Sequence, residues 1–233
     1  TLDNGIFNAG SQTIMATGDW RINGGTFNAE TSVVQLPGYG CNSTPVINGS
    51  HTLNNLTFNG LCTNMTITAD TVLTVRGALI FTSTYVSGLT INGPGTINAQ
   101  GNITIADAKT FNGTTSLVIN GTGSQIFTGN GEGKFYPNIR IEKPSGTLTL
   151  AGTIPVTSKW TYVSGTIDPG SSTVVFDGSN TISGTHTLGN VTMGSHYNTI
   201  TLSGGTTLSV QGLLTFDTDY STGPVTINGP GAL

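Results

Sequence analysis

The chain of 233 residues carries 7 Lys or Arg and 11 Asp or Glu, so 8% of it is charged and its net charge is −4, whereas a typical soluble domain is about 25% charged. Gly, Thr, Asn and Ser, which number 34, 42, 21 and 19, together make up half of the sequence. This composition excludes a basic nucleic-acid-binding face, charge-driven disorder and a mainly helical fold, and no apolar run approaches the roughly 20 residues of a membrane helix.

Short segments in which apolar residues alternate with Thr or another polar residue recur along the chain, as is typical of half-buried strands. Asn-Gly, Gly-Pro, Asp-Gly and Gly-Ser pairs, which favour turns, lie between them. No segment offers ten residues of helical period. In chain order, the expected strands are 56–58, 65–68, 73–75, 79–81, 89–91, 103–105, 117–119, 139–141, 148–150, 174–176 and 200–202.

A long unit is duplicated within the chain. Trp20 and Trp160 occupy equivalent positions in the two copies. Other matching segments, which follow at a nearly constant offset, are 51–58 with 186–193, 73–77 with 208–212 and 91–95 with 227–231. We therefore expect one elongated body over residues 1–233, with a first copy at about 1–140 and a truncated second copy at about 141–233. The chain begins without a leader pattern and stops inside a repeated pattern, so we expect a piece of a longer or processed protein.

These features predict an all-β fold, namely a parallel, right-handed β-solenoid built from the duplicated unit of roughly 136 residues. A pair of β-sandwiches is the alternative, but sandwich strands are usually longer and their turns less frequent. Stacked coils place equivalent positions about 4.8 Å apart, which penalises ladders of like charge and favours Thr, Asn and apolar residues. With about 20 residues in a coil, the chain forms about 11 coils, and the handedness follows the general preference of parallel crossovers.

Four stretches carry a resemblance to known proteins. Residues 160–168, 172–178 and 135–148 resemble the repeat arrays of very large microbial surface proteins. Residues 95–105 are similar to the coils of filamentous-haemagglutinin-type adhesins. The resemblance implies an extracellular β-helical shaft, stalk or filament, and it brings no catalytic residues.

The two cysteines, Cys41 and Cys62, are separated along the sequence by close to one coil. Residues stacked one coil apart are about 4.8 Å from each other, within the Cα range that a disulfide accepts. Both thiols are absent from the second copy. We expect a Cys41–Cys62 bridge and hence an oxidising compartment, with two unrelated buried thiols as the alternative. Alkylation under denaturing, non-reducing conditions distinguishes the two cases.

Residues suited to catalysis are sparse. Carbohydrate-active β-helix enzymes use clustered carboxylates or bound Ca²⁺, but only Asp217 and Asp219 lie close together, and we interpret them as a solvated face. The closely spaced charged residues Arg140, Glu142 and Lys143 indicate a strand on the surface. No phosphate loop, nucleophile–base spacing or set of metal ligands occurs, so we expect no catalytic residue, cofactor or metal.

Aromatic residues and histidines recur at equivalent positions of the two copies. We expect His51 and His186 to cap or stack at a coil corner. Trp20 and Trp160 are expected to cover the core in each copy, with sugar stacking as the alternative. The number of Asn-x-Ser/Thr sequons is close to chance, and they permit N-glycosylation without demanding it. They begin at Asn42, Asn48, Asn55, Asn64, Asn102, Asn112, Asn120 and Asn190.

Together these observations predict a non-enzymatic, extracellular structural protein, a segment of a cell-surface filament, sheath or adhesin shaft. The open end of a solenoid exposes unpaired strand edges, so we expect end-to-end association with neighbouring repeats or subunits. A glycan-binding adhesin module is the second expectation, and a carbohydrate-active β-helix enzyme the third. We expect no nucleic-acid partner and no membrane insertion of this segment.

Overall fold

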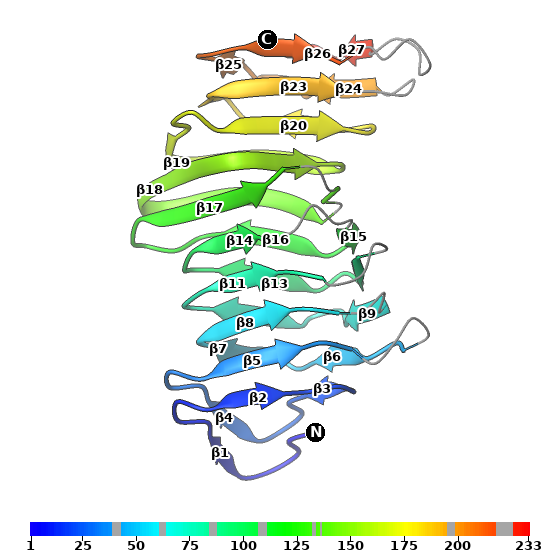
Figure 1. The fold of residues 1–233 in the computed structure, drawn as a ribbon, viewed down its shortest axis with the longest axis vertical. Helices are drawn as coiled ribbons and strands as arrows, with labels where there is room; N and C mark the ends of the chain where they lie inside the picture. The colour runs from blue at the N-terminus through cyan, green and yellow to red at the C-terminus, as the bar shows by residue number, and fades with distance from the viewer. Residues whose placement is uncertain are drawn as a thin grey trace.

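The computed structural model describes residues 1–38, 43–60, 64–83, 88–106, 111–131, 134–135, 137–194, 199–217 and 226–233. In this part of the chain the protein is all-β, and its strands stack in a β-solenoid of about nine turns. Figure 1 shows the turns following one another along the long axis, with the N- and C-termini at opposite ends. The fold class expected from the alternating segments is confirmed. Within the described residues, no helix is long and apolar enough to cross a membrane.

Three parallel ladders run along the axis and join successive turns. The first consists of β7 (His51–Leu53), β10 (Val72–Val75), β13 (Thr96–Ala99), β16 (Ser116–Ile119), β18 (Asn138–Val156), β19 (Lys159–Asp168), β21 (Thr181–Ser183), β24 (Thr199–Leu202) and β27 (Thr226–Asn228). The second consists of β2 (Thr13–Met15), β5 (Val33–Leu36), β8 (Asn55–Phe58), β11 (Leu79–Phe81), β14 (Ile103–Ile105), β17 (Gln125–Asn130), the long β18 again, β20 (Thr173–Asp177), β23 (Asn190–Gly194) and β26 (Leu214–Phe216).

The third ladder is shorter and lies in the first half of the stack. It consists of β3 (Trp20–Arg21), β6 (Val46–Asn48), β9 (Asn64–Ile67), β12 (Leu89–Asn92) and β15 (Phe111–Gly113). Two further parallel pairs are β1 (Ile6–Asn8) with β4 (Thr26–Asn28), and β22 (His186–Leu188) with β25 (Leu208–Val210).

The registers place apolar residues of successive turns directly over one another. One such column in the first ladder, with every side chain at most 2% exposed, contains Leu73, Ile97, Leu117, Ile139, Trp160, Ile182 and Leu202. Successive residues of a strand point to opposite faces. The apolar–Thr alternation of the sequence therefore becomes an apolar interior and a Thr-rich exterior.

The turns are longer than the sequence pattern predicts, and there are accordingly about nine of them instead of about 11. Leu79 pairs with Ile103 in the next turn, and Phe127 pairs with Leu150, so each of these turns contains more residues than the expected coil.

Two equivalent corners require glycine. Gly49 and Gly184 have φ angles of +89° and +84°, a backbone region that other residues rarely adopt. A Cβ at Gly49 would also collide with the carbonyl oxygen of Ile22, and a Cβ at Gly184 with that of Tyr162. These corners lead into β7 and β22, each of which begins with a histidine.

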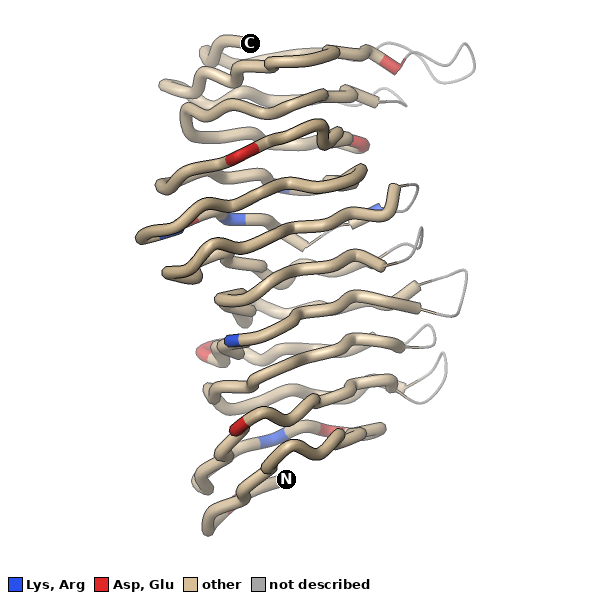
Figure 2. Tube along the Cα trace, turned by 60° about the vertical axis from the view of Figure 1, so that its left-hand side comes forward, with Lys and Arg blue, Asp and Glu red and all other residues tan. Residues whose placement is uncertain are grey.

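Charged residues are scattered along the stack, as Figure 2 shows. Three exposed or partly exposed ion pairs occur in the described part of the chain, at 2.9, 3.2 and 2.8 Å: Arg21–Asp19, Lys134–Asp177 and Arg140–Glu142.

Lys143 does not join this surface, contrary to the expectation of a surface strand. The alternation in β18 that turns Ile139 and Ile141 inward also turns Lys143 inward, and Lys143 is only 2% exposed. Its Nζ donates hydrogen bonds to the carbonyl oxygens of Gly121 and Gly123, at 2.7 and 2.8 Å, and to Oε1 of Gln125 at 2.8 Å. Burial lowers the pKa of this ammonium group.

Candidate functional site

A Trp–His hydrogen bond occurs at an equivalent corner of each copy. Nε1–H of Trp20 donates to Nε2 of His51 at 2.7 Å, and Nε1–H of Trp160 donates to Nε2 of His186 at 2.9 Å. The second pair is buried and the first is partly buried. The histidines thus occupy coil corners, as expected from their repeat positions.

The other ring nitrogen of each histidine faces a glycine carbonyl. Nδ1 of His51 lies 2.6 Å from the carbonyl oxygen of Gly49, and Nδ1 of His186 lies 2.8 Å from the carbonyl oxygen of Gly184. An indole N–H only donates and a carbonyl oxygen only accepts. Both imidazoles are therefore neutral, with the proton on Nδ1, and each ring links a tryptophan to a corner glycine.

Three aromatic rings from two neighbouring turns pack together at the first corner. The ring centroids of Trp20, Phe27 and His51 lie 5.4 to 6.1 Å from one another. β4 pairs with β1 and β7 pairs with β10, but no ladder joins β4 to β7, although their Cα atoms approach within 8 Å. β19 and β22 show the same interruption in the second copy.

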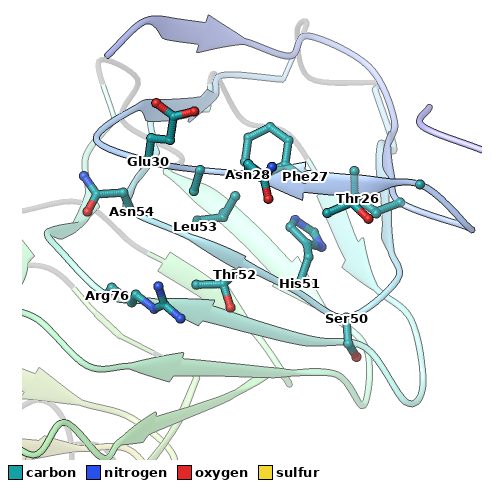
Figure 3. A pocket seen from close by; sticks show the side chains of 13 residues that line it. Thr26, Phe27, Asn28, Glu30, Ser50, His51, Thr52, Leu53, Asn54 and Arg76 are labelled. Atoms are coloured by element: carbon teal, nitrogen blue, oxygen red, sulfur yellow. The ribbon is translucent and has the colours of Figure 1, made fainter. Parts of the chain in front are cut away.

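A groove of about 600 Å³ opens on the first interruption, between β4 and β7. Figure 3 shows Glu30, Asn54 and Arg76 towards one end of this groove, with the rings of Phe27 and His51 near its middle. Hydroxyl and amide groups line the rest, from Thr26, Asn28, Ser50 and Thr52. The groove is therefore mixed in character, with ring faces, neutral polar groups and one charge of each sign.

The second copy has different residues at the equivalent place. Tyr162 stands where the first copy has Ile22, which lines the groove. The Tyr162 ring stacks on His186, with centroids 5.2 Å apart and an angle of 22° between the planes. Its hydroxyl donates to the carbonyl oxygen of Gly165 at 2.6 Å. A phenol ring thus covers the histidine that the first copy leaves beside an open groove.

The two end turns expose apolar residues whose equivalents inside the stack are buried. Phe216 in β26 is 46% exposed, whereas the equivalent Phe81 in β11 is 1% exposed. β11 has a ladder neighbour on each side, β8 and β14, while β26 pairs with β23 alone among the described strands. At the opposite end of the stack, Phe7 in β1 is 46% exposed, whereas its ladder partner Phe27 in the next turn is partly buried against the core.

The structure corrects one proposed role of the tryptophans. Trp160 is fully buried, so its ring has no free face on which a sugar could stack. Trp20 is half-buried, and its indole N–H is bonded to His51. Asp217 is exposed just after β26. Cys41, Cys62, Asp219 and His196 lie outside the described residues, so the disulfide stays a prediction.

Several sequon asparagines have structural contacts that the motif does not reveal. Side-chain oxygens of Asn55, Asn102 and Asn190 each accept a backbone N–H from the next turn, at 2.7 to 2.9 Å. Asn48 donates to Oγ1 of Thr68 at 2.8 Å. The amide oxygen of Asn120 is buried and has no hydrogen-bond partner in the part of the chain that the structure describes. The roles of Asn64 and Asn112 as glycosylation sites stay predictions, and Asn42 lies outside the described residues.

Acidification is expected to destabilise the fold through the two Trp–His pairs. Burial lowers the pKa of the His51 and His186 imidazoles below the ordinary value of 6.5, although the glycine carbonyls oppose this. The unfolded chain then takes up protons at a pH where the folded chain does not. The free energy of unfolding therefore falls as the pH drops from above 6.5 towards the lowered pKa values.

Thermal unfolding midpoints between neutral pH and about pH 5 measure this effect. A double variant, His51→Gln with His186→Gln, keeps an acceptor for each indole but does not titrate, and its midpoint should depend less on pH. The hydrogen bond from the Val46 backbone lowers the pKa of Asp19 below 3.8, so this carboxylate acts only in a more acidic range. A wild-type midpoint that stays constant between neutral pH and about pH 5 would contradict the role of the two histidines.

Among the described residues, no three His, Cys, Asp or Glu lie together as metal ligands would. No family model, no curated protein and no solved structure matches the chain.

Proposed function

We propose that this chain is a non-enzymatic structural segment of an extracellular shaft, such as a surface filament, sheath or adhesin stalk. Its end turns stack on turns of neighbouring repeats or subunits. The second ladder, from β2 to β26, would give such a shaft unbroken hydrogen bonding along its axis, and the buried columns fill its interior. The observation that carries the proposal is the contrast between Phe216, which is 46% exposed, and the equivalent Phe81, which is 1% exposed.

This contrast indicates what fits the end of the stack. Inside the chain, the turn that covers Phe81 contributes β14 with Ile103 and Ile105, both fully or almost fully buried. A further turn with the same alternation of apolar and polar residues would cover Phe216 in the same way and pair with the edge of β26 that has no partner among the described strands. Burying one large apolar side chain contributes about 1.5–3 kcal/mol, and the unpaired edge adds a template for backbone hydrogen bonds.

The purified chain is expected to self-associate reversibly as its concentration rises, which light scattering measures as an increase in mean mass. Phe216→Asp and Phe7→Asp place a charge on one end face each, and either should reduce the association. Ile126→Asp is the matched control, because Ile126 is 44% exposed in β17, in the middle of the stack.

Two results would contradict end-to-end stacking. One is a wild-type chain that remains monomeric at every concentration. The other is an Ile126→Asp variant that loses association as fully as the two end-face variants, since contacts between the sides of the shafts would then be responsible.

The extracellular location rests on the expected Cys41–Cys62 bridge and on the resemblance of the sequence to surface-protein repeats. Two free thiols under denaturing, non-reducing conditions would remove the first of these supports.

A further inference from the structure

We propose that the groove between β4 and β7 binds a neutral saccharide, whose hydroxyl groups bridge the two strands where their ladder is interrupted. This binding function is separate from the stacking of the end turns. It uses a groove on the side of the stack, and the residues that are varied to test it, Ile22, Glu30 and Arg76, are not those varied to test the stacking. The argument rests on the width of the gap, the chemistry of its walls and the comparison with the second copy.

The gap between the strands excludes an inserted peptide strand. A strand that paired with both β4 and β7 would need them about 9.6 Å apart, twice the normal spacing of about 4.8 Å. Their Cα atoms approach within 8 Å, which is too close. No ladder joins the two strands directly, so the backbone groups of β4 and β7 that face each other have no ladder partners. Hydroxyl groups of a ligand bound in the groove are small enough to contact both strands across this gap.

The walls offer what a saccharide requires. The two strand edges present backbone N–H and C=O groups, and Thr26, Asn28 and Thr52 add hydroxyl and amide groups beside them. Phe27 and His51 supply ring faces in the middle of the groove, where the apolar C–H side of a sugar ring can pack. The volume of about 600 Å³ falls within the range of about 300–1,000 Å³ found for small-molecule sites.

The charges in the groove favour a neutral ligand. Glu30 and Arg76 both line it, and neither takes part in an ion pair within the described part of the chain. One carboxylate and one guanidinium leave the groove with no net charge, so it has no preference for an anion or a cation. Both groups form strong hydrogen bonds to hydroxyls, because one partner in each bond is ionised.

Glu30 is kept at a position that suits glycine better. Its φ angle is +46°, and the equivalent residue of the second copy is Gly170, with a φ angle of +48°. A residue other than glycine is strained at this positive φ angle, and the turn itself could be formed by glycine without that strain. The first copy therefore carries a carboxylate at the end of the groove at the expense of local stability, which supports a role for this side chain in binding.

The second copy serves as an internal comparison. Tyr162 covers His186 there, and the residues equivalent to Asn54 and Arg76 are glycine and glutamine. The second copy thus has a ring over the histidine and lacks the polar end of the groove. This difference supplies variants that the fold already accommodates at equivalent places.

Isothermal titration of the full chain with cellotriose, chitotriose, trigalacturonate and an extended Thr/Val hexapeptide tests the proposal. We expect millimolar or tighter binding of at least one of the two neutral trisaccharides, and weaker or no binding of trigalacturonate and of the peptide. Ile22→Tyr introduces the ring found in the second copy and should abolish the binding. Arg76→Gln and Glu30→Gly, which also copy the second unit, should each weaken it about tenfold or more.

Lys159→Gln is the matched control for Arg76→Gln, because Lys159 is an exposed residue on β19 outside the groove. The Lys159→Gln variant should bind the neutral trisaccharide with the affinity of the wild type. Circular dichroism and the thermal midpoint show whether each variant keeps the fold, and Glu30→Gly tests the groove even if Ile22→Tyr does not fold. The proposal is wrong if neither neutral trisaccharide binds at millimolar concentration, if binding survives both Ile22→Tyr and Arg76→Gln in folded protein, or if only trigalacturonate or the peptide binds.

Discussion

Trp160→Ala is expected to lower the free energy of unfolding by about 3–5 kcal/mol, the range for truncating a buried tryptophan. Trp160 is fully buried in the column between Ile139 and Ile182, and its ring packs edge-on against Phe176 with centroids 6.1 Å apart. Truncation leaves a cavity inside the stack and also removes the hydrogen-bond donor to Nε2 of His186. Urea denaturation monitored by circular dichroism measures the loss.

Trp20→Ala provides the matched comparison at the equivalent position. Because Trp20 is only half-buried, less apolar surface is lost, and we expect a clearly smaller cost than at Trp160. Trp160→Phe removes the indole N–H while keeping most of the ring, and it separates the hydrogen bond from the packing. Equal costs for the two alanine variants would contradict the different burial of the two corners.

Lys143→Met is expected to destabilise the protein by about 2–4 kcal/mol, because hydrogen bonds from a charged donor contribute about 1.5–3 kcal/mol each and are not fully additive. Methionine matches the length of the side chain but leaves the carbonyl oxygens of Gly121 and Gly123 and Oε1 of Gln125 without this donor. Removing a buried charge acts in the opposite direction by avoiding its desolvation. All three ammonium protons are donated, so we expect the lost hydrogen bonds to dominate.

Lys159→Met is the control for this substitution, since Lys159 is exposed and should tolerate the change within about 0.5 kcal/mol. Chemical denaturation of both variants gives the comparison. A Lys143→Met variant that is as stable as the wild type, or more stable, would show that desolvation of the ammonium group outweighs its hydrogen bonds.

Much of the strand pattern could be predicted because the alternation of apolar and polar residues is local. The expected strands 79–81 and 103–105 coincide with β11 and β14. The segments 139–141 and 148–150 were expected to be separate strands, but both lie in β18, which continues through Pro144 and Gly146. Whether a corner keeps its ladder pairing depends on the turns above and below it, and no local pattern contains that information.

The contacts at the candidate site depend on distant residues and were beyond the reach of local patterns. Trp20 and His51 are 31 residues apart, whereas Trp160 and His186 are 26 apart, because the connecting segments differ in length. The repeat indicated that these residues matter, but not that they bond to each other. The sequence did contain one signal for the groove, because Ile22 of the first copy is aligned with Tyr162 of the second.

The interruption between β4 and β7 also has a mechanical consequence. A pull along the solenoid axis is borne by the hydrogen bonds that run parallel to that axis, and no ladder joins β4 to β7 at this level. The load falls on the remaining connections, such as β5 to β8 and β3 to β6. The solenoid is therefore more compliant at the place where its side opens, and a molecule that bridges the two strands would stiffen it there.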